Sequence, residues 1–148
     1  MYMEFGWINI FGAAIVILIM IPNIIYAVKH KQTEAEKELP PYLSICEQIG
    51  RYGCIILMWL PLFVWKFEFG SVEELLVYLI TTVILLLGYY LFWVKYARNK
   101  TLTTAMALAV IPTILFWLSG VLLKHWALVA FAILFGLSHC KITYLTHR

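Results

Sequence analysis

The stretch Ser44-Ile-Cys-Glu-Gln-Ile-Gly-Arg-Tyr-Gly-Cys54 places a glutamate and an arginine one helical turn apart inside a largely apolar segment. Side chains four residues apart meet on one face of a helix, so Glu47 and Arg51 can pair. Ionisable groups are costly in hydrocarbon, where by default they face protein or water and have a partner. We therefore expect the helix that carries this stretch to turn its polar face toward neighbouring helices.

The composition of the whole chain is that of a membrane protein. Its 148 residues are 64% hydrophobic and only 13% charged, whereas soluble domains are roughly half apolar and about a quarter charged. The length allows a single transmembrane domain over residues 1–148 and no separate soluble domain. The net charge of +3 is small and is distributed by side of the membrane, which argues against nucleic acid as a partner.

Successive apolar segments predict an all-α fold, a bundle of five transmembrane helices in a polytopic integral membrane protein. Each segment is long enough for the ~20 residues that a bilayer core requires. The predicted helices cover about 5–28, 42–67, 72–97, 101–123 and 126–144. Sequence neighbours are joined by short connections, so we expect them to be antiparallel, with their small or polar stripes turned inward.

Local signals mark several helix ends. Ser71 and Glu74 have the spacing of a capping box at the start of the third helix. Pro61 is expected to bend the second helix in its outer half. Lys124 and His125 form the whole connection between the fourth and fifth helices, and both are expected at the outer surface. Gly50 and Gly53 are expected to let another helix approach the second one closely.

The distribution of lysine and arginine predicts the orientation, because the loops of the cytoplasmic side carry an excess of them. One side carries Lys66 and Lys124, and the other carries Lys29, Lys31, Lys37, Lys95, Arg98, Lys100, Lys141 and Arg148. The N-terminus is therefore predicted outside and the C-terminus inside.

Polar residues from four of the predicted helices fall on the inward stripes at similar depth. Asn23 precedes Lys29 by six residues and Tyr89 precedes Lys95 by six, which corresponds to about 9 Å along a helix. On the same count, Glu47, Arg51 and His139 also fall in the inner third of the bundle. The predicted ligand-binding set is Glu47, Arg51, Asn23, His139 and Tyr89.

Two interpretations of this set remain open. In the first, Glu47 and Arg51 form a satisfied pair near the interface, and Asn23 and His139 make hydrogen bonds between helices. In the second, these residues line a water-filled vestibule open to the cytoplasm, where Glu47 binds a cation or a proton and Arg51 binds an anionic group. His139 would then titrate near neutral pH.

No catalytic residue, metal site or cofactor is predicted. The sequence has no nucleophile-plus-base signature, no phosphate-cradling glycine loop and no paired carboxylates suited to metal chemistry. His139-Cys140 with Cys46 matches no ligand spacing of a soft-metal site.

Three classes of function remain open. The first is a permease or channel, or its membrane subunit, with a cytoplasm-facing polar pocket. The second is a non-catalytic accessory, regulatory or self-protection membrane protein, and the third is a membrane enzyme acting on a lipid-type substrate. The lipid bilayer is the expected environment. Since five helices enclose little space, a transport path also implies a homo-oligomer or a membrane partner subunit.

Two motifs and one helix carry a resemblance. Pro22-Asn-Ile-Ile-Tyr-Ala27, followed by Glu47-Gln-Ile-Gly-Arg-Tyr-Gly53 and a terminal helix with His139, resembles a group of small, uncharacterised polytopic membrane proteins of Gram-positive bacteria. The resemblance covers the whole chain. It implies a multi-pass protein of the bacterial cytoplasmic (inner) membrane and brings no activity, substrate or catalytic residue.

Overall fold

The computed structural model describes residues 3–4, 9–30, 38–60 and 68–148. This part of the chain forms five helices and one short antiparallel strand pair, in which Met3 pairs with Phe69. The elements are β1 (Met3–Glu4), α1 (Ile10–Lys29), α2 (Pro41–Trp59), β2 (Glu68–Phe69), α3 (Val72–Arg98), α4 (Leu102–Leu122) and α5 (Trp126–His147). The all-α prediction is confirmed, and the strand pair was not predicted.

Four of the helices in the described part, α1, α3, α4 and α5, are long and apolar enough to cross a membrane. The fold is therefore that of a helical protein consistent with membrane insertion. The α2 helix is less apolar because Glu47, Gln48 and Arg51 fall within its 19 residues. Its exposed apolar side chains nevertheless form one stripe with helical spacing, made of Tyr42, Ile45, Ile49, Tyr52 and Ile56.

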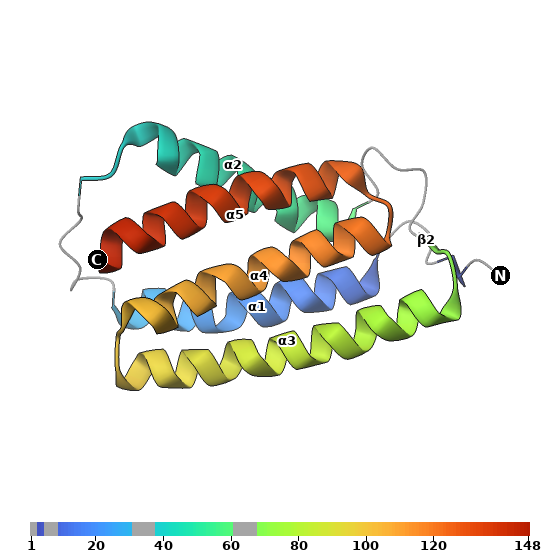
Figure 1. Ribbon diagram of the computed structural model, residues 1–148, viewed down its shortest axis with the longest axis horizontal. Helices are drawn as coiled ribbons and strands as arrows, with labels where there is room; N and C mark the ends of the chain where they lie inside the picture. The colour runs from blue at the N-terminus through green and yellow to red at the C-terminus, as the bar shows by residue number, and fades with distance from the viewer. Residues whose placement is uncertain (1–2, 5–8, 31–37, 61–67) are drawn as a thin grey trace.

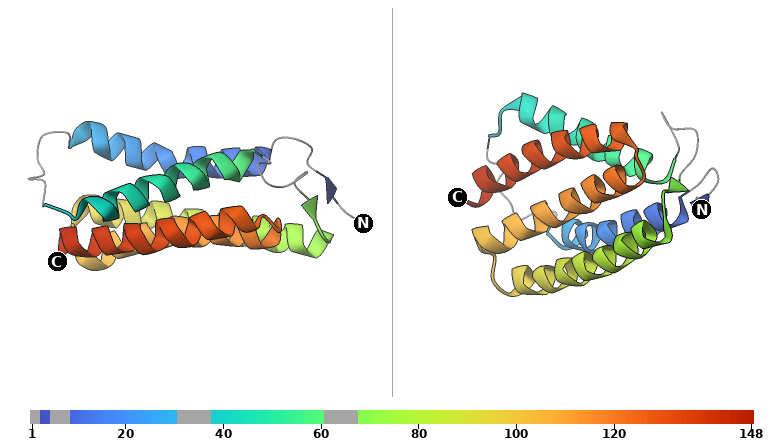
Figure 2. Two further views of the ribbon diagram at one scale, coloured as in Figure 1. Left: turned by 90° about the horizontal axis from the view of Figure 1, so that it is seen from above. Right: turned by 45° about the vertical axis from the view of Figure 1, so that its right-hand side comes forward.

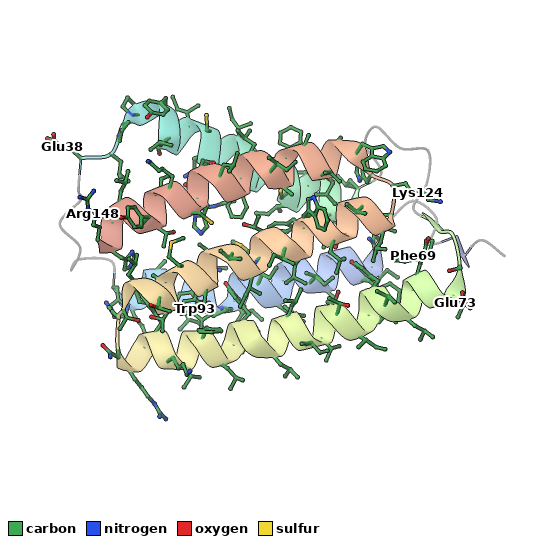
Figure 3. All side chains as sticks on the ribbon, viewed as in Figure 1. Glu38, Phe69, Glu73, Trp93, Lys124 and Arg148 are labelled. Carbon is green, nitrogen blue, oxygen red and sulfur yellow. The ribbon has the colours of Figure 1, made fainter. Side chains whose placement is uncertain are left out.

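The helices run along a common long axis, with β1 and the C-terminal end of α5 at opposite ends (Figure 1). Two layers are visible from above, one of α3, α4 and α5 and one of α1 and α2 (Figure 2). The α5 helix packs most extensively, against α2 on one side and α4 on the other, while α3 packs on α4. Along α3, apolar side chains project away from the bundle (Figure 3), as lipid contact requires.

Glycines set the closest helix contacts. A Cβ atom on Gly50 would lie 2.6 Å from the backbone nitrogen of Phe135, and one on Gly53 would lie 2.3 Å from the Phe131 ring. The predicted close approach at both glycines is thereby confirmed, and the helix that approaches is α5. A Cβ atom on Gly12 would lie 2.0 Å from the Met58 carbonyl oxygen, so α1 meets α2 with equal closeness at one end.

Two predicted helix ends are wrong for identifiable reasons. The first helix was predicted from about residue 5, but Asn9 is its N-cap, since its side chain accepts a 3.0 Å hydrogen bond from the Gly12 backbone N–H. The second helix was predicted to reach residue 67, but α2 ends at Trp59 and Leu60 is extended. A residue before proline is driven out of the helical region, so Pro61 accounts for the end. Residues 5–8 and 61–67 themselves lie outside the described part.

The start of α3 and the α4–α5 connection also correct the predictions. Ser71 does accept from the Glu74 backbone N–H, but the Glu74 carboxylate accepts from Gly70 rather than from Ser71. His125, predicted at the surface, is fully buried as the N-cap of α5. The turn is so tight, with Lys124 at a φ of 54°, that the His125 backbone N–H donates back to the Gly120 carbonyl oxygen at 2.8 Å.

Replacing Gly50 with alanine tests the α2–α5 contact. The added methyl group meets the backbone of Phe135, which cannot move without separating the helices. We expect a loss of about 1–3 kcal/mol in the free energy of unfolding, as for overpacking elsewhere. The measurement is reversible unfolding in mixed micelles.

Gly88→Ala is the matched control, because no atom lies within 4 Å of a Cβ atom there. It should be neutral or stabilising, since alanine favours the helix by about 1 kcal/mol over glycine. Equal effects of the two substitutions would contradict the close packing of α2 on α5.

Candidate functional site

The carboxylate of Glu47 lies at the centre of a three-residue cluster. Its Oε1 atom accepts from the Arg51 guanidinium one turn along α2, and it also lies 2.9 Å from Nδ1 of His139 on α5. The Glu47 side chain is only 8% exposed, whereas those of His139 and Arg51 are 26% and 36% exposed. The carboxylate is thus buried behind its two partners, and the partners face the more open side.

Asn23 and Tyr89 form a second polar contact, between α1 and α3. The Asn23 amide donates to the Tyr89 hydroxyl at 2.7 Å and to the Ile19 carbonyl oxygen at 2.8 Å. The Tyr89 hydroxyl in turn donates to the same carbonyl at 3.3 Å. Tyr89 is fully buried, so its hydroxyl requires these partners.

A cavity of about 270 Å³ joins the two polar groups. All five helices contribute to its lining, and Asn23, Arg51, Tyr89 and His139 all belong to it. Glu47 is the one predicted site residue that does not line the cavity. It contacts Arg51 and His139, which do line it. The remaining lining is apolar and comes chiefly from α1 and α4, with Val16, Met20, Pro112 and Phe116 among its residues, and Phe135 of α5 also belongs to it.

The cavity exists because α1 and α2 diverge. They are in contact where Gly12 meets Met58 and where the Asn9 backbone N–H donates to the Trp59 carbonyl oxygen at 3.1 Å. From this point they separate toward the opposite end of the bundle (Figure 2). Asn23 on α1 is exposed and Arg51 on α2 is partly exposed, so the opening of the cavity lies between these two helices.

A contact that the sequence did not predict secures the middle of α1. Pro22 has no backbone N–H, so the Leu18 carbonyl lacks its usual donor four residues ahead. The Tyr90 hydroxyl from α3 donates to this carbonyl at 2.7 Å. The proline was a visible signal for an unsatisfied carbonyl, but nothing in the sequence identified Tyr90 as its donor.

The aromatic wall of the cavity was not predicted from the sequence either. The His139 ring stacks on Phe135 with centroids 4.8 Å apart and planes 14° apart. Pro112 of α4 also lines the cavity, and it cannot donate to the carbonyl of Leu108, another lining residue. The α4 helix therefore contributes to the cavity wall, where the prediction assigned no site residue.

Comparison of the chain with protein-family models, with curated proteins and with solved structures found no match.

Replacing Arg51 with leucine tests the electrostatic structure of the cluster. Glu47 then keeps only His139, and an underpaired buried carboxylate is destabilising by roughly 1–3 kcal/mol. The double variant Glu47→Gln, Arg51→Leu removes the charge as well and should be the more stable of the two. Thermal unfolding in lipid nanodiscs measures the difference. A double variant less stable than Arg51→Leu would contradict the assigned burial of Glu47.

Proposed function

We propose that the chain spans the bacterial cytoplasmic membrane five times, with α2 as the fifth span. Nineteen residues of helix extend about 28 Å at 1.5 Å per residue, close to the ~30 Å of a bilayer core. A membrane position for α2 is compatible with its polar residues, because Glu47 is paired with Arg51 and His139 on the face of the helix that is turned toward the bundle. The face of α2 that is turned away from the bundle carries the apolar stripe from Tyr42 to Ile56, which would contact lipid.

The orientation that we propose is N-terminus outside and C-terminus inside. Support comes from the described basic residues, because Lys29, Lys95, Arg98 and Lys100 belong to the helix ends and the connection on one side, and Lys124 belongs to the α4–α5 turn on the other. A green fluorescent protein fused after Arg148 should therefore be fluorescent, and alkaline phosphatase at the same place should be inactive. The reverse pattern would contradict this orientation.

Within this topology, the best-supported function is ligand binding by a small permease or by the membrane subunit of one. The observation that carries the proposal is the cavity between the helices, because four residues chosen for their polarity and depth line it together with apolar walls. Ligand sites are typically mostly apolar cavities of about 300–1,000 Å³ with a few convergent polar groups. An oligomer or a partner subunit would complete a path across the membrane.

Filling the cavity tests this function directly. Met20 lines the cavity, and Met20→Trp should occlude it; Ile24→Trp, on the exposed side of the same helix, is the matched control. Liposomes containing each protein are loaded with a uniformly ¹³C-labelled extract of water-soluble metabolites. We expect a small set of labelled compounds to leave wild-type and Ile24→Trp liposomes and to be retained by Met20→Trp liposomes, as mass spectrometry of the medium would detect.

Release of the same compounds from all three preparations, or from none of them, would contradict the proposed permease function. The absence of release would favour the alternative, a non-catalytic accessory or regulatory membrane protein. One observation supports that alternative: Glu47 is already satisfied inside the chain by Arg51 and His139. A stable membrane partner that co-purifies with wild type and with Met20→Trp alike would then be expected.

A further inference from the structure

The positive member of the ion pair faces the cavity and the negative member does not. Arg51 lines the cavity, whereas Glu47 is buried behind it with only 8% of its side chain exposed. None of the described residues that line the cavity is acidic. The pair therefore has its positive end at the cavity wall, an arrangement that favours an anion over a cation.

The guanidinium of Arg51 has hydrogen-bonding capacity left over. It has five N–H donors, and within the described residues its recorded partner is Oε1 of Glu47. Planar guanidinium groups bind carboxylate and phosphate oxygens through two parallel hydrogen bonds. The ion pair with Glu47 holds Arg51 in place on α2, so the remaining donors are positioned before any ligand arrives.

The rest of the cavity is suited to an apolar body. The stacked rings of Phe135 and His139 form a flat wall next to Arg51. Pro112 and Phe116 of α4 and Met20 of α1 continue the apolar surface. Since the opening lies between α1 and α2, a molecule can enter sideways from the inner part of the bilayer as well as from water.

We infer that the cavity binds a small amphiphile with one anionic head group, placing the head on Arg51 beside His139 and the apolar body against α1, α4 and Phe135. This inference rests on the proposed function and assigns its ligand to a chemical class. A single-chain lipid with a carboxylate or phosphate head and a water-soluble organic anion with an apolar ring or chain share this chemistry. The cavity of about 270 Å³ is close to the lower limit of typical ligand sites, so the apolar body is a single chain or ring.

Photo-crosslinking in phosphatidylcholine nanodiscs tests the inference. The probe is a dodecanoic acid with a diazirine on its chain, and cross-linked peptides are mapped by mass spectrometry. Labelling is expected on α1, α4 and α5 at the cavity. Dodecanoate should compete at about tenfold lower membrane concentration than dodecanol or dodecyltrimethylammonium, because only the anion gains charge-assisted hydrogen bonds. Competition by benzoate would assign the ligand to the aqueous source, and its failure to compete would assign it to the lipid.

The paired variant Glu47→Gln, Arg51→Gln removes both charges and leaves no carboxylate unpaired, so it tests the charge preference without the folding defect expected of Arg51 variants alone. Its preference for dodecanoate over dodecanol should fall to about one, while Arg98→Gln at the exposed end of α3 should keep the wild-type preference.

Cavity labelling with equal competition by the anion, the alcohol and the cation in wild type would overturn the inference and leave the proposed ligand cavity standing. Labelling that is confined to lipid-facing residues and is unchanged in Met20→Trp would overturn both.

Discussion

The arrangement of the bundle depends on the need of one buried carboxylate for hydrogen-bond donors. Glu47 takes one donor from its own helix, Arg51, and one from α5, His139. A carboxylate left without partners in such a place is strongly destabilising. Because Gly50 brings the backbone of α5 against α2, the cluster and the glycine together fix the rotation of α2. The apolar stripe of this helix then faces outward.

The same constraint explains why the cavity lies where it does. Four helices pack in succession, in the order α2, α5, α4 and α3, whereas α1 has fewer contacts with α2, among them the close one at Gly12. Farther along, α1 is secured to α3 by Tyr89 and Tyr90, at carbonyls next to the Pro22 irregularity. The α1 helix is therefore held at one end and on one side, and the space beside it toward α2 becomes the cavity. A binding site of this kind needs no long loops, because its walls are helices.

The angular position of each residue around its helix axis and its depth along that axis were enough to predict that the five polar site residues come together. Asn23, Arg51, Tyr89 and His139 line one cavity and Glu47 contacts two of them, since a regular rise and twist per residue relate position in sequence to position in space. That they bind a ligand stays a prediction. The apolar side of the cavity was not predicted, because among many apolar residues the ones that line a space are selected by how helices diverge.

The local geometry at several helix ends was also not predicted by the sequence patterns. Asn9 falls within the helix predicted over about 5–28, yet it caps the helix. His125 looks like a polar turn residue, yet a three-residue connection between packed helices leaves it inside. The second helix was predicted to continue past Pro61 because hydrophobicity continues there, but α2 ends at Trp59, since the residue before a proline is driven out of the helical region. In each case a tertiary or backbone constraint overrides the pattern.

The central claim is that Glu47 and His139, 92 residues apart in sequence, are coupled in the folded protein. A double-mutant cycle with Glu47→Gln, His139→Leu and their combination, measured by reversible unfolding in bilayer-like micelles, tests it most directly. We predict a coupling free energy between about 0.6 kcal/mol, the average for polar contacts between membrane helices, and about 1.7 kcal/mol, the largest value for such contacts. Additivity of the two single substitutions within about 0.3 kcal/mol would contradict the account.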